Sequence, residues 1–192
     1  SFGNYYPRIV LNGDGSPMIT WGGGSKVYFS KMSSSGFSEP IQLNNDTTNA
    51  YVASWTGPDL TARNDTIYAA FMHQDWGKKT YITRSFDNGN TFSEPFLIEN
   101  YPDSTSRFPM LAMDQNGHPI AGIMKMTMNG AHPQYVVRRS FDYGSTFTEE
   151  SNAGGWSGSE SEACDCCPGA IKATNGKLAV FYRDNLNNVR DI

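Results

Sequence analysis

The sequence has no long apolar run, no cluster of basic residues and no extended helical pattern. No stretch of its 192 residues approaches the roughly 18 consecutive apolar residues of a membrane-spanning helix, so no such helix is expected. Nineteen Asp and Glu outnumber fifteen Lys and Arg, and the formal charge of −4 is not that of a nucleic-acid-binding surface. No segment keeps a helical period over several turns, which argues against a helical fold.

Cysteine is scarce, and all of it lies in one place. The only three cysteines occur in the tetrapeptide Cys164–Cys167, at positions Cys164, Cys166 and Cys167, which is neither a spaced disulfide framework nor a two-pair zinc pattern. We expect one disulfide within the cluster, with the third thiol left over or paired elsewhere. The alternative is a soft-metal site, because thiolates select Cu(I) or Zn and methionines alternate along a neighbouring stretch at Met124, Met126 and Met128. Apart from this alternative, neither a metal nor a cofactor is expected.

The residues that are abundant favour short strands and tight turns. Aromatic residues make up 13% of the sequence, beside nineteen Gly and ten Pro, and Ser and Thr are frequent. Aromatic residues and Thr fit a pleated sheet, whereas Gly, Pro and Ser fit turns. The composition predicts an all-β fold.

One octapeptide is repeated along the chain. Ser85–Phe92 reads SFDNGNTF and Ser140–Phe147 reads SFDYGSTF, and the displacement is 140 − 85 = 55 residues. Another 55 residues upstream, Ser30–Phe37 is a worn copy that has lost the Asp and keeps the closing Phe. Repeats with a period near fifty residues are typical of propeller blades.

The segments between the repeats follow one pattern. A short strand after a proline is followed by a Gly/Asn turn, an apolar strand and a half-polar strand, which predicts four-stranded antiparallel blades. The expected first strands are Pro7–Leu11, Pro58–Thr61, Pro109–Met113 and Pro168–Ile171. We expect one partial β-propeller over residues 1–192, with blades near 5–45, 56–100, 107–150 and 166–192. The last blade would stop inside its third strand at Val189–Ile192, so about three and a half blades need a partner, the rest of the same polypeptide or a second chain, to close the ring.

The repeated octapeptide resembles the Asp box, or bacterial neuraminidase repeat, of the sialidase-like propellers. The resemblance implies a fragment of a six-bladed propeller in which the Asp accepts backbone N–H groups, the Gly supplies a positive φ and the Phe plugs the gap between sheets. The positions with this structural role are Ser85, Asp87, Gly89, Thr91, Phe92, Ser140, Asp142, Gly144, Thr146 and Phe147.

The same resemblance implies that the functional face lies opposite the Asp boxes. Sialidases of this kind hold a substrate carboxylate with three arginines, use a Tyr nucleophile assisted by a Glu, and protonate with an Asp. Arg107-Phe108-Pro109 is similar to the motif of the first arginine. The loop where the acid would follow, Thr127–Pro133, contains no carboxylate, and Asp75 lies in a blade that has no matching arginine.

We therefore expect an extracytoplasmic propeller that binds a glycan or a protein partner on this face, without nucleic acid or a membrane span. The alternative is an exo-α-sialidase or related glycoside hydrolase whose nucleophile lies beyond this sequence. The candidate catalytic residues are Asp75, Tyr182 and Arg183. The candidate substrate-binding residues are Arg107, His73, Trp76, His132 and Asp184. Convergence of Arg107, Arg183 and one more arginine on a single anion would favour the enzyme.

Overall fold

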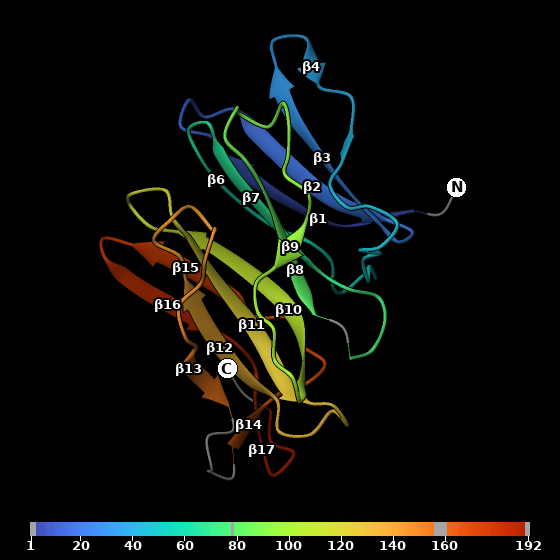
Figure 1. Ribbon diagram of the computed structural model, residues 1–192, viewed down its shortest axis with the longest axis vertical. Coiled ribbons are helices and arrows are strands. Elements are labelled where there is room, and N and C mark those ends of the chain that lie inside the picture. The colour runs from blue at the N-terminus through green and yellow to red at the C-terminus, as the bar shows by residue number, and fades with distance from the viewer. Residues whose placement is uncertain (1–2, 78, 156–160, 191–192) are drawn as a thin grey trace.

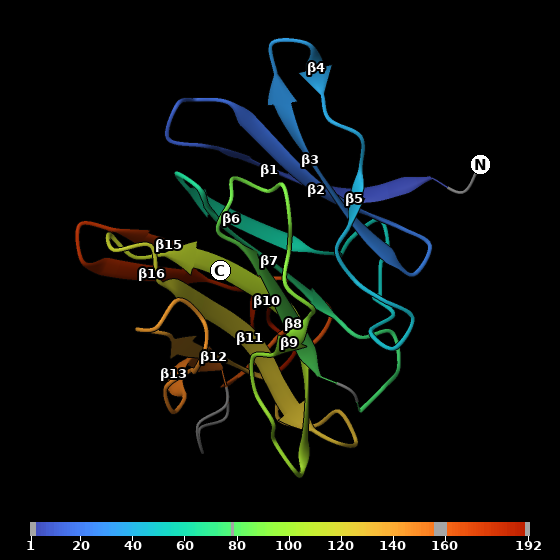
Figure 2. The same cartoon turned by 45° about the horizontal axis from the view of Figure 1, so that its top comes forward.

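The protein is built from β-strands that form successive antiparallel sheets along the chain. A computed structural model describes residues 3–77, 79–155 and 161–190. The regular secondary structure in these ranges consists of β-strands, without any helix. The sheets follow one another from the N-terminal strands (blue) to the C-terminal strands (red) in Figure 1, and Figure 2 shows the same succession from a tilted view. The prediction of an all-β partial propeller is confirmed.

The first sheet contains three long strands and two short ones. Its strands are β1 (Asn4–Leu11), β2 (Pro17–Gly23), β3 (Lys26–Ser33), β4 (Gly36–Phe37) and β5 (Ile41–Gln42). The long strands pair in chain order, and both short strands pair with β3. The worn repeat thus forms a hairpin, β3–β4, in which Gly36 has a φ of 112°.

The second and third sheets are complete four-stranded blades with their strands in chain order. The second contains β6 (Asp59–Arg63), β7 (Thr66–Met72), β8 (Thr80–Ser85) and β9 (Phe96–Leu97). The third contains β10 (Ser104–Met113), β11 (Pro119–Thr127), β12 (Gln134–Arg139) and β13 (Ser151–Gly155). β13 lies just beyond residue 150, where the sequence predicted this blade to end.

The C-terminal part differs from the expected fourth blade. β15 (Ala170–Thr174) pairs with β16 (Lys177–Phe181), whereas β14 (Ser161–Ala163) pairs with β17 (Asp184–Leu186). The sequence predicted a third strand at Val189–Ile192. This prediction is wrong for Val189 and Arg190, which form no strand, and the last two positions lie outside the described residues. Leu186 and Val189 exchange backbone hydrogen bonds of 2.9 and 2.8 Å, because the intervening asparagines adopt positive φ and reverse the chain.

Burial follows the position of each sheet in the array. In β7 and β11, residues from Ile67 to Phe71 and from Pro119 to Met124 are buried on both faces, as expected for strands between two neighbouring sheets. β16 instead alternates between half-buried and exposed residues. The apolar second strands are thus buried on both faces in β7 and β11, whereas β16 lacks a second covering sheet among the described residues.

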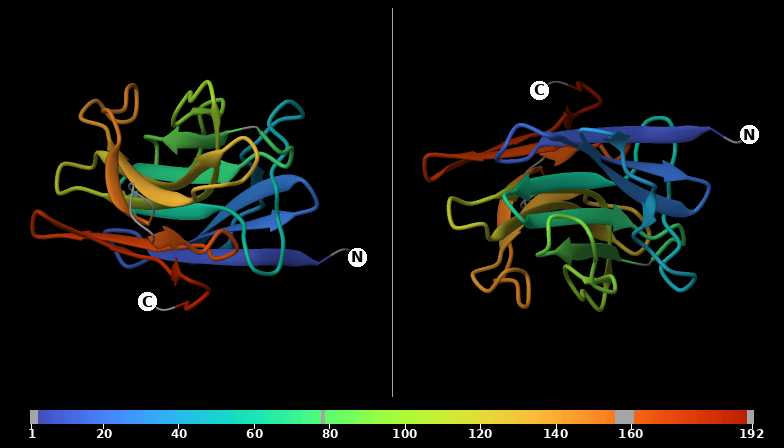
Figure 3. Two further views of the ribbon diagram at one scale, coloured as in Figure 1. Left: turned by 90° about the horizontal axis from the view of Figure 1, so that it is seen from below. Right: turned by 90° about the horizontal axis from the view of Figure 1, so that it is seen from above.

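The first strands of the sheets surround a common axis. β1, β6, β10 and β15 together line a channel of about 380 Å³, so the N-terminal sheet and the C-terminal hairpin lie close to each other. Figure 3 shows their blue and red strands side by side in both views. The repeated octapeptides contact the turns that follow the first strands, through Asn88 with Asn12 and Asp65 and through Ser140 with Pro119. They therefore lie at the end of the molecule opposite to the starts of the first strands.

Candidate functional site

The two repeated octapeptides form self-contained turns, which we call the repeat turns, Ser85–Phe92 and Ser140–Phe147. In the first, Asp87 Oδ1 accepts hydrogen bonds from the Ser85 hydroxyl at 2.7 Å and the Thr91 backbone N–H at 2.9 Å, and Oδ2 accepts the Thr91 hydroxyl at 2.7 Å. The second turn repeats these contacts around Asp142 within 0.1 Å. Hydrogen bonds from Thr146 and Ser140 lower the pKa of Asp142 to about 2, and those from Thr91 and Ser85 likewise lower the pKa of Asp87.

The opposite end of the channel, which we call the axial mouth, begins with strained backbone. The β1–β2 and β10–β11 ladders each contain an irregularity, between Tyr5 and Arg8 and between Arg107 and Met110. Within them, Tyr6 and Phe108 have φ of 52° and 50°, although each is a bulky residue that precedes a proline. Strained backbone clusters at active sites and ligand clamps, so these two equivalent places mark this end as a candidate site.

Arg8 and Asp59 pair across the axial mouth from neighbouring first strands. Arg8 Nε lies 3.4 Å from Asp59 Oδ1, and Asp59 Oδ2 accepts the backbone N–H of Leu111 at 2.7 Å. Asp59 therefore connects three sheets. The Arg8 guanidinium also donates to the Tyr6 hydroxyl at 2.9 Å and lies 4.7 Å from the centre of the Tyr6 ring.

Burial and the neighbouring polar groups act in opposite directions on the pKa of Asp59. Burial raises the pKa of Asp59, against the lowering effect of the Leu111 N–H and the Arg8 charge. Burial also raises the pKa of Tyr6. Arg8 Nε is buried and makes no hydrogen bond of good geometry among the described residues, so the arginine has donor capacity that its protein partners do not use.

A second tyrosine connects the axial mouth to the cysteines. Tyr135 is fully buried, its hydroxyl donates to the Cys167 carbonyl at 2.7 Å, and burial raises its pKa. A Cβ added at Gly169, just before β15, would lie 3.2 Å from the Tyr135 ring, which places this ring beside the start of that first strand. The candidate nucleophile Tyr182 packs on Tyr135, with ring centres 5.5 Å apart.

The predicted arginines have different partners. Arg107 stacks on aromatic rings, 4.7 Å from the centre of Phe108 and 5.6 Å from that of Trp76. Trp76 donates its indole N–H to the Met128 carbonyl at 2.8 Å, which joins the loops of two sheets. Arg183 instead directs Nη1 toward the sulfur of Cys167 at 3.9 Å.

The other predicted residues lie on the rim of the same end. His73 Nδ1 accepts the backbone N–H of Asp75 at 3.0 Å, and the Asp75 side chain is exposed. His132 Nδ1 lies 3.0 Å from Glu162 Oε1, and Asp184 is paired with Ala163 in the β14–β17 ladder. The contacts of the rim residues thus come from several loops, whereas Arg8, Asp59 and Tyr6 form one connected group.

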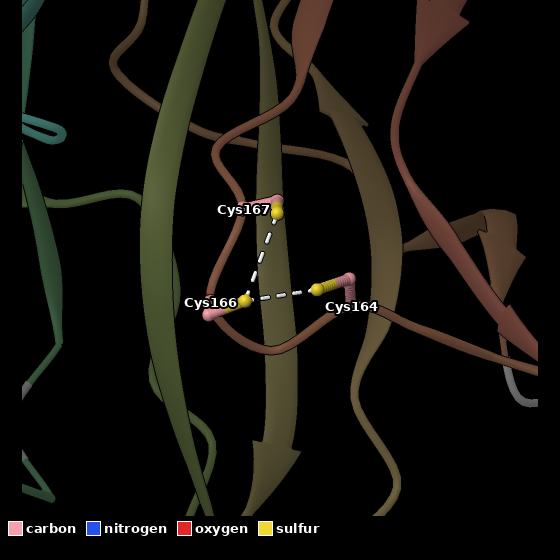
Figure 4. Close-up of side chains that lie close together, drawn as sticks. All are labelled: Cys164, Cys166 and Cys167. Carbon is pink, nitrogen blue, oxygen red and sulfur yellow. Dashed lines mark hydrogen bonds between the residues drawn. The ribbon is translucent and has the colours of Figure 1, made fainter. Parts of the chain in front are cut away.

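The three cysteines meet at the edge of the axial mouth. Their sulfurs converge, with Cys164 Sγ to Cys166 Sγ at 3.0 Å and Cys166 Sγ to Cys167 Sγ at 3.7 Å, and all three cysteines are free (Figure 4). Of the methionines that the sequence placed beside them, Met124 and Met126 are buried in the core, whereas Met128 is exposed.

Sequence reasoning missed Arg8, Asp59, Tyr6 and Tyr135. The predicted residues came from the connections between strands and from the Arg107 motif, whereas Arg8 and Asp59 lie inside the first strands of two other sheets. A signal was present, because each of them directly follows the proline that opens its blade, at equivalent positions 59 − 8 = 51 residues apart. Side chains at equivalent positions of neighbouring inner strands meet at the axis.

Comparison with known proteins identifies the fold. No family model matches the sequence, and no curated protein matches it. Among solved structures, the GH93 α-L-arabinofuranosidase of Fusarium graminearum with arabinobiose superposes with a TM-score of 0.65 at 15% identity, over 94% of this chain and 56% of that one. The Penicillium chrysogenum α-L-arabinanase with arabinobiose gives 0.59 at 11% identity, over 95% and 58%. The Bacteroides thetaiotaomicron endo-arabinase gives 0.58 at 12%, over 96% and 78%.

These similar structures are β-propeller enzymes, and at these identities the likeness shows the fold alone. The chain spans a little over half of the length of the first two, 56% and 58%. Within the described residues, no helix is long and apolar enough to cross a membrane.

Proposed function

We propose that this chain is part of an extracytoplasmic β-propeller that binds a glycan at the axial mouth, with Arg8 and Asp59 as the groups that engage it. The observation that carries the proposal is the half-buried Arg8–Asp59–Tyr6 group at the point where four first strands meet. Arginine donors and carboxylate acceptors suit the hydroxyl and carboxylate groups of sugars, and the nearby aromatic rings suit sugar faces.

The sialidase-like assignment rests on the repeat turns. Their hydrogen bonds around Asp87 and Asp142 suit the structural role that the Asp-box resemblance implies, and they lie at the other end of the blades from the axial mouth. In this assignment Arg107, His73, Trp76, His132 and Asp184 form the rim of the glycan site. The remaining blades, from the same polypeptide or a second chain, complete its wall.

A glycoside hydrolase is the second candidate. The raised pKa of Asp59 favours it, because a carboxyl group that keeps its proton to higher pH is a better general acid. Most glycosidases need two carboxyl groups that flank the scissile bond. Asp59 is the only carboxylate among the described residues that line the channel, so hydrolysis requires a second group outside that lining, with Asp75 and Tyr182 the predicted candidates.

The test is calorimetric titration of the purified protein with arabinobiose and with 3′-sialyllactose. We expect one of them to bind, and Asp59→Asn to weaken that binding by about 30-fold, which corresponds to about 2 kcal/mol for the loss of one charge of a partly buried pair. The asparagine keeps an acceptor for the Leu111 N–H, so the fold is preserved. Lys177→Gln, an exposed change in the β15–β16 hairpin at the other end, is the matched control and should bind normally.

Hydrolysis is tested on the same proteins with 4-methylumbelliferyl arabinofuranoside and sialoside. Turnover that disappears in Asp59→Asn supports the enzyme, and binding without turnover across pH rejects it. No binding of either sugar, or equal binding by wild type and Asp59→Asn, would overturn a glycan site at the axial mouth.

A further inference from the structure

The cysteine cluster is a preorganised set of three sulfur ligands. Cys164, Cys166 and Cys167 are the one group of three or more His, Cys, Asp or Glu side chains, among the described residues, whose ligand atoms all lie within 4.8 Å of one another. Cys167 N–H donates to the Cys164 carbonyl at 3.2 Å, and this turn folds the three side chains to the same side (Figure 4).

Both ends of the turn are fixed to the rest of the fold. The Cys164 N–H donates to the Arg183 carbonyl at 2.7 Å, and the Tyr135 hydroxyl holds the Cys167 carbonyl. Cys164 is fully buried beside Ala163, whereas Cys166 is exposed. The cluster is therefore buried on the side of Cys164 and open to solvent on the side of Cys166, where an ion can enter.

The spacing of the sulfurs suits a single metal ion. Three thiolates bound to one ion at about 2.3 Å lie about 3.8 to 4.0 Å from one another. Two of the sulfur–sulfur distances are 3.0 and 3.7 Å, and all three are below 4.8 Å. Side-chain shifts of less than about 1 Å would therefore bring the sulfurs to the separations that one metal ion requires.

The charges beside the cluster favour a monovalent ion. Three thiolates and one monovalent cation carry a net charge of −2, and two guanidinium groups face the sulfurs, Arg183 Nη1 at 3.9 Å from Cys167 Sγ and Arg190 Nη1 at 3.8 Å from Cys166 Sγ. Zn²⁺ in a structural site takes four ligands, and the described group offers three. Thiolates also select Cu(I) by their softness.

We propose that Cys164, Cys166 and Cys167 bind one Cu(I) ion in a three-thiolate site at the edge of the axial mouth. Each thiol gives up its S–H proton to solvent when its sulfur binds the metal, so binding is favoured as the pH rises. The copper remains Cu(I) throughout, and no electron transfer is involved. Metal binding at this site does not depend on glycan binding at the axial mouth.

The experiment is anaerobic titration of the reduced protein with the coloured Cu(I) complex of bicinchoninate. We expect the protein to remove one equivalent of Cu(I). Cys166→Ser should weaken binding by at least about 100-fold, and Arg183→Gln by about tenfold, since it leaves the ligands and removes a neighbouring charge. Cys166 is exposed, and circular dichroism checks that its variant is folded. Met128→Leu, which removes an exposed sulfur nearby, is the control and should bind Cu(I) like wild type.

Several results would overturn the site. Failure of the reduced protein to take Cu(I) from bicinchoninate is one, and loss of binding in Met128→Leu with retention in Cys166→Ser is another. Tight 1:1 binding of Zn²⁺ without uptake of Cu(I) would reject the monovalent ion. Mass spectrometry checks whether the cluster contains a disulfide. If it does, and the protein takes up no Cu(I) even after the disulfide is reduced, the proposal is overturned.

Discussion

The two ends of the blades hold their carboxylates in opposite ways. At the repeat turns, Asp87 accepts hydrogen bonds from four donors of its own turn, and these bonds lower its pKa. At the axial mouth, Asp59 is largely buried, accepts one backbone N–H from another sheet and has its pKa raised by burial. A carboxylate whose acceptor sites are filled by its own turn has little left for a ligand, whereas Asp59 and its partner Arg8 keep unused capacity.

This difference predicts that the repeat turns serve the stability of the fold, whereas Asp59 and Arg8 serve ligand binding. Changes at the repeat turns should lower stability and leave ligand binding intact, because they act on hairpins far from the axial mouth. Changes at Asp59 should act on both, because this residue holds three sheets together and faces the ligand.

The largest loss of stability is expected for Gly89→Ala. Gly89 has a φ of 74°, and a Cβ added there would lie 2.6 Å from the fully buried ring of Phe29 and 3.0 Å from Ile67. Strain at a positive φ and overpacking of a buried ring together should cost about 3 kcal/mol of unfolding free energy. Urea denaturation measures it, and calorimetry should find sugar binding unchanged in the folded protein.

Gly144→Ala is the matched control in the other repeat turn. Its φ is 86°, and the added Cβ would come no closer than 3.5 Å to Pro119, which is ordinary contact. Only the backbone cost remains, about 1 kcal/mol. Equal losses for the two alanines would show that Phe29 yields without cost and that overpacking plays no part.

A smaller loss is expected for Asp59→Ala at the axial mouth. The change leaves the N–H of the buried Leu111 without its acceptor and Arg8 without its counter-charge, which should cost about 2 kcal/mol. Urea denaturation of Asp59→Ala beside Asp59→Asn separates the two effects, because the asparagine restores the acceptor and not the charge. An alanine variant as stable as wild type would contradict the role of Asp59 as a link between sheets.

The sequence predicted the parts of this fold that local chemistry determines. The repeat turns close through bonds between residues two to four positions apart, so the octapeptide alone predicts them. β13 was missed because its residues, Ser151–Gly155, are polar and small and show no apolar strand pattern, although they pair with β12 along the backbone and through the Asn152–Gln134 side-chain hydrogen bond. The expected last strand failed because Asn187 and Asn188 adopt positive φ and turn the chain back on itself.

The candidate site could be predicted only in part, because it is assembled from different blades. The rim residues were named from their loops, but the structure joins them in separate pairs such as Arg107 with Trp76. Arg8 and Asp59 come together through the closure of first strands around an axis, which no local pattern describes. Their equivalent places after the blade prolines were the available signal.

The smallest expected effect concerns how the unfolding free energy changes with pH. Asp142 in a repeat turn and Asp59 at the axial mouth should contribute to it with opposite signs. The pKa of Asp142 falls from 3.8 to about 2 on folding, so its stabilising contribution is present above about pH 4 and is lost as the pH falls toward 2. The pKa of Asp59 rises on folding, so its contribution is most favourable below its ordinary value of 3.8 and worsens as the pH rises through the folded pKa.

Unfolding free energies of wild type, Asp142→Asn and Asp59→Asn between pH 2 and 7 compare the two contributions. The advantage of wild type over Asp142→Asn should shrink on acidification, because the lowered pKa stabilises the folded protein only while the carboxylate is ionised. The advantage of wild type over Asp59→Asn should grow over the same range, because protonation removes the cost of a buried charge. Difference curves that slope in the same direction would mean that the two carboxylates share one environment, and the distinction between the repeat turns and the axial mouth would fail.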